Sequence, residues 1–228
     1  HRDLHTAYRR QRQMCIRDRF TRANLINSIS GIKPANLVGT VSKSGIRNLA
    51  IFSSVVHLGS NPPLLGMVQR PLTSEVGDTF RNIQDTGCFT INHVREELIE
   101  KAHLTSAKLG SNISEFDEFG IKEAFLDGFE APFVAESQVR IGLKYRETIP
   151  IELNNTLLVI GEVVHISISE AGVEKDGQLD LEALGSVGIS GLNRYYTFAK
   201  TAEHAYVGNP NQRSGGKVEK QAKANKDV

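Results

Sequence analysis

Two long runs of β-forming residues, separated by a short turn, constrain the fold of this chain more than any other feature. The runs are Ser137–Ile151 and Thr156–Ser169, and the Asn154-Asn155 pair between them is typical of a tight hairpin. A turn this short joins antiparallel neighbours, because a parallel pair needs a long crossover connection. The second half of the chain should therefore contain two long, adjacent, antiparallel strands.

The first half continues the hairpin pattern with shorter strands. Strands are predicted over Asn36–Val41 and Asn48–His57, around a turn that begins at Ser42. A third lies within Asn61–Pro71, bounded by prolines that cannot donate to a ladder. A fourth is predicted over Cys88–Val94.

Two helices interrupt these strands. The first is predicted within Gly77–Gly87, with Asp78 as its N-cap and Gly87 as its stop. The second is predicted within Glu96–Gly110. One face of this second helix carries the stripe Leu98, Ala102, Thr105 and Leu109.

The remaining segments predict little regular structure. Ser111–Val134 is polar and aromatic with several glycines, which indicates an ordered excursion, and Leu184–Phe198 predicts a last short strand. About six to eight strands in hairpin order, with two inserted helices, favour a mainly β fold: an antiparallel barrel in one domain over residues 20–207. The βαβ alternation of a Rossmann domain is not the pattern.

The two ends of the chain differ in composition from residues 20–207. Residues 1–19 lack apolar periodicity and hold six arginines against two aspartates, and without them the formal net charge falls from +1 to −3. A basic arm for nucleic acid and a targeting peptide are two interpretations. Met14–Arg19 favours a third, a non-native leader translated from a library-preparation sequence. Residues 208–228 predict a disordered tail.

Several classes of chemistry lack their motifs. The sequence holds no G-x-G-x-x-G, no Walker loop, no G-x-S-x-G and no H-E-x-x-H. Ser53 and His57 would lie about 13 Å apart on an extended strand, too far for a nucleophile and its base. Two cysteines cannot build a disulfide framework, so a reducing, cytoplasmic setting is expected, and no metal site is predicted.

A group of hydroxyls and one guanidinium indicates a binding site for a phosphorylated ligand. Ser53 and Ser54 are adjacent small hydroxyls on a predicted strand, which leave backbone amides approachable. Arg70 is followed by Thr73 and then by Thr79 at the start of a predicted helix, where backbone N–H groups attract phosphate. The alternative interpretation is that these hydroxyls only cap turns.

The order of several motifs resembles the flavin reductase-like, FMN-binding split-barrel family. The resemblance covers Asn24–Tyr196. The motifs that carry it are N-L-A-I-F-S-S-V (48–55), S-N-P-P-L-L (60–65), R-P (70–71), D-T-F-R-N-I (78–83) and T-G-C-F-T-I-N-H (86–93). The chain departs from the family's short reductases in a longer stretch between the serines and Pro62, and in a small insertion before Asp78.

The resemblance implies an antiparallel split β-barrel that holds FMN at a homodimer interface and reduces it with NADH or NADPH. It implies that Ser53, Ser54 and Val55 line the flavin, and that Pro62 and Pro63 end their strand early to keep the flavin edge open. The remaining cofactor-binding residues that it implies are Arg70, Thr73 and Thr79 toward the phosphate, with Asn92 and His93 near it. No protein residue is expected to be catalytic, because the cofactor carries the hydride chemistry.

Two other functions remain open from the sequence. One is an electron carrier that binds FMN, has no nicotinamide site, and exchanges electrons with a partner oxygenase or another acceptor protein. The other is a barrel without redox activity that binds a different phosphorylated ligand or a partner protein. A membrane is not expected as a partner, since no apolar run approaches the ~20 residues of a membrane span. Nucleic acid is not expected either, because the excess of basic residues lies in residues 1–19.

Overall fold

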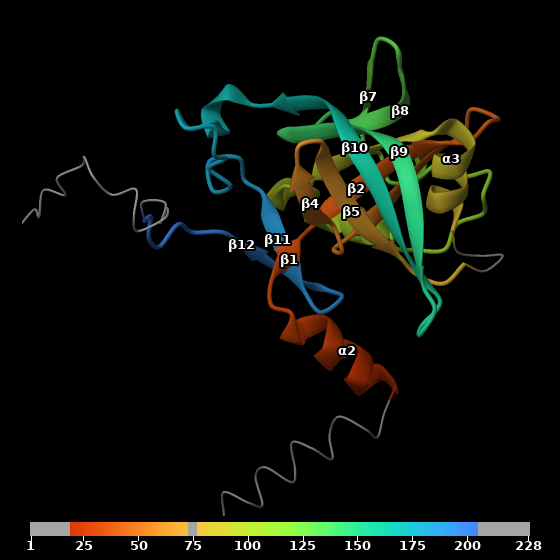
Figure 1. Cartoon of the computed structure of the whole chain (residues 1–228), viewed down its shortest axis with the longest axis horizontal. Helices are drawn as coiled ribbons and strands as arrows, with labels where there is room; N and C mark the ends of the chain where they lie inside the picture. The colour runs from red at the N-terminus through yellow and green to blue at the C-terminus, as the bar shows by residue number, and fades with distance from the viewer. Residues whose placement is uncertain (1–18, 73–76, 205–228) are drawn as a thin grey trace, which may run out of the picture.

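A computed structural model describes residues 19–72 and 77–204 of the chain, and its centre is one seven-stranded antiparallel sheet that curls into a barrel (Figure 1). The predicted mainly β, antiparallel fold is confirmed. In spatial order the strands are β3 (Arg47–Phe52), β2 (Asn36–Val41), β6 (Cys88–His93), β9 (Val139–Ile151), β10 (Thr156–Ile168), β5 (Pro63–Gln69) and β4 (Val56–Ser60). The predicted leader and the predicted tail lie outside the described residues, except for Arg19.

The chain passes directly from one edge of this sheet to the other. β3 and β4 are consecutive in sequence but stand at opposite edges of the sheet, and only Ser53–Val55 connect them. The continuous strand predicted over Asn48–His57 is therefore wrong, because the chain must leave one ladder before it joins the next. This link, Ser53–Val55, is where the sheet closes on itself.

The two prolines lie at a hairpin turn, Pro62 within it and Pro63 at the start of the next strand. β4 and β5 form a hairpin in which Ser60 pairs with Pro63, so Asn61 and Pro62 make the turn. Pro63 therefore begins β5, and the expectation that the prolines free the strand end is not what the hairpin shows.

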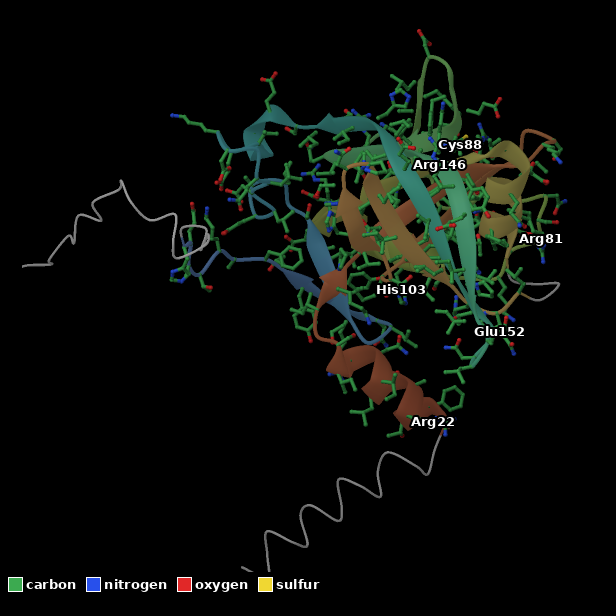
Figure 2. The ribbon with its side chains drawn as sticks, viewed as in Figure 1. Arg22, Arg81, Cys88, His103, Arg146 and Glu152 are labelled. Atoms are coloured by element: carbon green, nitrogen blue, oxygen red, sulfur yellow. The ribbon has the colours of Figure 1, made fainter. Side chains whose placement is uncertain are left out.

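The long hairpin of β9 and β10 is confirmed, with pairing from Thr156↔Ile151 to Ile168↔Val139. Asn155 adopts φ 57°, the left-handed conformation that asparagine tolerates in tight turns. Figure 2 shows Glu152 at the tip of this hairpin. A register shift occurs at Gly161, and a β-carbon there would lie 2.6 Å from the ring of Phe89. The glycine thus makes room for a large side chain in the barrel interior.

Apolar side chains fill both faces of the sheet. Inside the barrel pack Val38, Met67, Phe80, Ile83, Phe89, Ile91, Leu143 and Val159. Outside it, a second cluster packs Leu37 and Leu49 of the barrel against helices and the small sheet. That small sheet has the order β1 (Lys33–Pro34), β11 (Val187–Ser190), β12 (Arg194–Thr197). Two strands thus stand where one was predicted.

Helix α3 (Asp78–Thr86) plugs the barrel with Phe80 and Ile83. Its predicted stop is confirmed, since Gly87 adopts φ 73° and its N–H bonds the carbonyl of Ile83. The predicted N-cap is wrong: Gly77 occupies that position, with φ 122°. Asp78 instead lies inside the first turn and pairs with Arg81 at 2.6 Å, where its negative charge suits the helix dipole.

The second predicted helix is shorter than expected. It comprises a 3-10 turn, η1 (Glu96–Leu98), and α4 (Ile99–Leu104), so Leu109 lies beyond the helix. Segment 111–134 is more regular than predicted, with helix α5 (Glu115–Glu118) and the hairpin of β7 (Glu123–Leu126) and β8 (Phe129–Val134).

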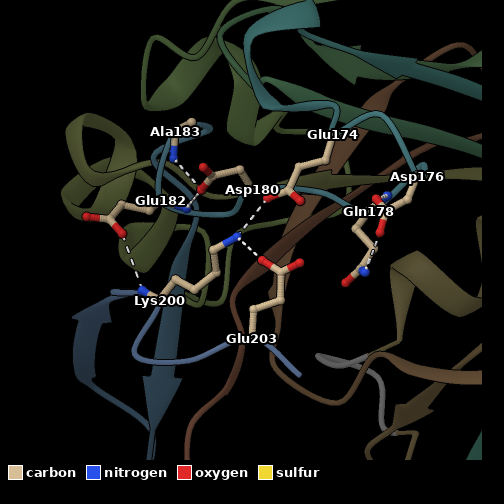
Figure 3. A network of polar contacts seen from close by, with 8 residues as sticks. All are labelled: Glu174, Asp176, Gln178, Asp180, Glu182, Ala183, Lys200 and Glu203. Atoms are coloured by element: carbon tan, nitrogen blue, oxygen red, sulfur yellow. Dashed lines mark hydrogen bonds and ion pairs between the residues drawn. The ribbon is translucent and has the colours of Figure 1, made fainter. Parts of the chain in front are cut away.

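The outer elements are fixed to the body by polar contacts. Glu115 accepts the N–H of Leu49 at 2.9 Å, so α5 satisfies a backbone donor on the edge strand β3. After β12, Lys200 bonds Glu174 at 3.0 Å, which ties the end of the described chain to the loop after η2 (Glu170–Gly172) (Figure 3). Lys200 also bonds Glu203 within the same terminal segment, at 2.9 Å. Helix α2 (Arg19–Ile29) extends away from the barrel beside β1 (Figure 1).

Candidate functional site

The hydroxyl of Ser54 holds the link Ser53–Val55 to strand β5. Ser54 Oγ donates to the carbonyl of Val68 at 3.0 Å and accepts the N–H of Val68 at 3.1 Å. The β4–β5 ladder pairs Val56 with Gly66, so the same register, continued by two residues, puts Ser54 opposite Val68. One side chain therefore supplies both bonds that a strand backbone would make there. The only donor of this hydroxyl and one of its two acceptor positions are engaged, so a ligand hydrogen-bond acceptor would have to use the main chain at Ser54.

The sheet register brings His93 near the same link. Phe52, which precedes Ser53, pairs with Asn36, and Asn36 pairs with His93. Two strand spacings of about 4.8 Å put the main chains of Phe52 and His93 about 10 Å apart. Ser53 and His93, two predicted binding residues 40 positions apart in sequence, thus lie near each other on the sheet.

His93 is held as a neutral imidazole. Its Nδ1 lies 3.2 Å from the hydroxyl of Ser186 on the segment before β11, and its carbonyl accepts the hydroxyl of Ser137 at 2.9 Å. Burial lowers the pKa of His93 from 6.5 to about 4. At neutral pH this ring can donate or accept a hydrogen bond but brings no charge to an anion.

Thr79 fixes helix α3 to the sheet. Its hydroxyl accepts the amide N–H of Asn48 on β3 at 3.1 Å, and Asn48 also reaches Thr40 on β2 at 3.3 Å. Asn82, one turn further along α3, donates to the same Thr40 at 3.2 Å. Thr79 is buried within this network, so its predicted contact with a phosphate has support only from its place in the first turn of the helix.

The end of β5 adds one charged group beside the link. Arg70 follows Gln69, the last residue of β5, and is exposed. Thr73 lies outside the described residues, so its predicted role stays a prediction. The guanidinium of Arg70 is well placed for an anion that approaches from solvent.

Asn92 is engaged within the sheet. Its amide donates to the carbonyl of Leu37 at 3.0 Å and to Thr90 at 2.9 Å, and its oxygen accepts the N–H of Val134 at 3.0 Å. The side chain has no exposed surface. These bonds fasten β8 across the sheet, and contact between Asn92 and a ligand would require their release.

Sequence reasoning missed Gln69 and Ser186 at this site. Gln69 occupies the same face of β5 as Leu65 and Met67, which face the barrel interior. A polar residue at an inward position of a strand is the signal that could have identified it. Ser186 had no such signal, because its contact with His93 joins segments 93 residues apart.

These residues make a binding site more readily than a hydrolytic one. The link Ser53–Val55 leaves the ladders and so presents main-chain groups; Arg70 adds a positive charge; and Gln69 adds a buried amide oxygen without a partner in the part of the chain that the structure describes. Such donors and acceptors fit a phosphorylated heterocycle. Within the described ranges, no three potential metal ligands come together, and no helix is long and apolar enough to cross a membrane.

Comparison with known proteins gives consistent matches across the barrel. Residues 32–181 match the model of the flavin reductase like domain. A protein of Halalkalibacterium halodurans without an assigned activity is 33% identical over 174 residues, which cover 74% of this chain and 83% of that protein.

Two solved structures have the same fold. A proposed flavin reductase with a split barrel domain from Shewanella frigidimarina is 45% identical, with a TM-score of 0.81 over 85% of this chain and 96% of that one. The flavoredoxin of Desulfovibrio vulgaris has a TM-score of 0.67 at 24% identity, over 77% of this chain and 91% of that one.

The lowered pKa of His93 predicts a specific dependence of stability on pH. The unfolded chain takes up a proton near pH 6.5, whereas the folded chain resists it until about pH 4. The free energy of unfolding should therefore fall as pH drops from 6.5 to 4, with His93 contributing about 3 kcal/mol of that loss. Urea denaturation of His93→Gln between pH 7 and pH 4 should show a shallower fall than the wild type.

His57→Gln is the matched control, because His57 is an exposed histidine on β4. It should keep the wild-type slope. An unchanged slope in His93→Gln would contradict the burial of a neutral imidazole at this position.

Proposed function

Because the chain belongs to the flavin reductase-like family, we propose that it is an oxidoreductase that binds FMN and reduces it with NADH or NADPH. The match over residues 32–181, which spans the whole seven-stranded sheet, carries this proposal. The 45% identity to the proposed flavin reductase of Shewanella frigidimarina supports the same activity.

The residues around the link Ser53–Val55 would hold the cofactor. Main-chain groups of the link and the hydroxyl of Ser53 would contact the flavin, and Arg70 would pair with its phosphate. When bound, FMN would supply the hydride chemistry that no side chain provides. His93 would bind as a neutral ring, since burial lowers its pKa to about 4.

The chain's contribution to the reaction would be positioning. The clamp between Ser54 and Val68 fixes the link, and the network of Thr79, Asn48 and Thr40 fixes the helix across from it. A site with rigid walls holds two reactants in a productive geometry without a further entropic cost.

A flavin-containing electron carrier is the second candidate. The fold similarity to the flavoredoxin of Desulfovibrio vulgaris favours it, although that likeness extends to the fold alone. Such a carrier would bind FMN and take its electrons from another protein rather than from a nicotinamide.

Anaerobic absorbance spectroscopy tests the activity. The purified chain mixed with FMN and freed of excess cofactor should retain bands near about 370 and 450 nm. These bands should bleach on addition of NADH, or of NADPH in a separate sample. Bands that persist with both nicotinamides and bleach only with dithionite would favour the carrier. A protein that retains no flavin would overturn both candidates.

We also propose that a second copy of this chain covers an apolar stripe on the outer face of the barrel. The stripe consists of Val56, Leu58, Leu158 and Ile149, which run across β4, β5, β10 and β9. Val56, Leu58 and Ile149 are 47%, 41% and 47% exposed. A glycine, Gly66, lies between them, and Leu58 and Leu158 close over it. An apolar face next to an edge strand can be covered by the same face of a second copy, which is the arrangement of a two-fold dimer.

This stripe begins directly after Val55, so the second copy would border the flavin site. Light scattering should give the mass of two chains for the wild type. Leu58→Lys should give the mass of one chain, because it places a charge in the contact. Phe125→Lys, at the exposed tip of the β7–β8 hairpin, should remain a dimer. A wild type of single-chain mass would contradict the dimer.

A further inference from the structure

Gln69 carries a buried hydrogen-bond acceptor that the protein itself does not use. The residue is 4% exposed, and its Oε1 is buried without a hydrogen-bond partner among the described residues. Leaving a buried acceptor unpaired destabilises a fold, so such atoms are few in native proteins. The position therefore suggests an acceptor kept for something other than stability.

The orientation of the Gln69 amide follows from the hydrogen bond that its nitrogen makes. Nε2 of Gln69 lies 3.2 Å from the carbonyl of Arg70, which can only accept a hydrogen bond. The NH₂ group must therefore be at that end, and the oxygen must be the atom without a partner.

Gln69 has apolar neighbours along β5 and across the ladder to β10, and the register that puts Ser54 opposite Val68 puts Ser53 opposite Gln69. On the inward face of β5 its neighbours in line are Leu65 and Met67, and across the ladder it pairs with Leu157 of β10. An apolar wall with a single acceptor suits a flat aromatic ring that has one donor on its edge. It suits a polyol with several hydroxyls less well, because most of these would stay unpaired.

The position of Gln69 is fixed relative to the proposed flavin site. The residue directly before it, Val68, is held through both main-chain groups by the hydroxyl of Ser54. The residue directly after it is Arg70, the proposed partner of the phosphate. Gln69 thus lies between the residue that holds the link Ser53–Val55 in place and the proposed partner of the phosphate.

We propose that Oε1 of Gln69 accepts a hydrogen bond from the N3–H group of the flavin ring. This inference rests on the proposed function. The oxidised ring has one N–H donor, at N3, and its other polar ring atoms are acceptors. A site built around that donor discriminates against flavins that lack it, because the buried oxygen is then left unpaired. Gln69 is therefore a specificity-determining residue for the cofactor.

Gln69→Met tests the proposal, because methionine has nearly the same length and carries no oxygen. The dissociation constant for FMN, measured by quenching of flavin fluorescence, should rise roughly tenfold, the loss expected for one neutral hydrogen bond. The thermal midpoint of the flavin-free variant should stay close to that of the wild type, because removal of the unpaired acceptor offsets the lost bond from Nε2 to the carbonyl of Arg70. A residue with a structural role would show a lower midpoint.

The second probe is 3-methyl-FMN, which lacks the N3–H donor. The wild type should bind it at least tenfold more weakly than FMN, whereas Gln69→Met should discriminate between the two much less. Met67→Leu is the matched control, an apolar change on the same face of β5 that should keep the wild-type discrimination.

The outcomes distinguish a failure of the proposed role of Gln69 from a failure of the proposed function. FMN binding by Gln69→Met with wild-type affinity would overturn the role of Gln69 and leave the proposed function intact. Undiminished discrimination in Gln69→Met would place the N3–H donor at another acceptor and would overturn it too. Failure of the wild type to bind FMN would instead overturn the proposed function.

Discussion

The two hydrogen bonds between Ser54 and Val68 are the contact on which the closure of this barrel depends. The chain leaves β3 at one edge of the sheet and enters β4 at the opposite edge within three residues. A link this short cannot satisfy β5 with its own main chain, so the serine hydroxyl acts as donor and acceptor in its place. The link Ser53–Val55 both closes the barrel and makes the proposed flavin contact, so the bonds that fix the link would also fix the flavin contact.

Polar groups on the barrel divide into two kinds, and the division separates structure from proposed function. Asn92, Thr79 and Asn48 use their side chains to fasten β8 and α3 to the sheet. Gln69 has an oxygen that none of the described residues satisfies, and Arg70 is exposed to solvent. The unpaired oxygen of Gln69 lowers the stability of the free protein, and both groups are available to a ligand.

The sequence predicted well those features that depend on neighbouring residues. The β9–β10 hairpin follows from its alternating runs and its asparagine turn, and the end of α3 follows from the backbone freedom of Gly87. The break at Ser53–Val55 was missed, because β3 and β4 look like one strand until the sheet order separates them. The N-cap was assigned to Asp78 because aspartate suits that position, yet Gly77 takes it in a conformation that only glycine adopts easily.

The site was predicted unevenly for the same reason. Local motifs identified the segment Ser53–Val55 and His93, and the register Phe52–Asn36–His93 brings them together. They also pointed to Asn92, whose neighbours in the fold, Leu37 and Val134, are 55 and 42 residues away in sequence. Long-range partners decide whether a polar side chain is occupied or free, and a single sequence does not contain them.

Amide hydrogen exchange at Val68, resolved by residue, tests the closure most directly. The N–H of Val68 donates to a side chain, Ser54 Oγ, at 3.1 Å, so its protection reports on that hydroxyl. Ser54→Ala should accelerate exchange at Val68 at least tenfold while Met67 and the β9–β10 ladder keep their protection, and it should weaken FMN binding. Ser44→Ala, in the exposed turn between β2 and β3, should change neither. A Val68 amide that exchanges equally slowly in Ser54→Ala would contradict the role of the serine in closing the barrel.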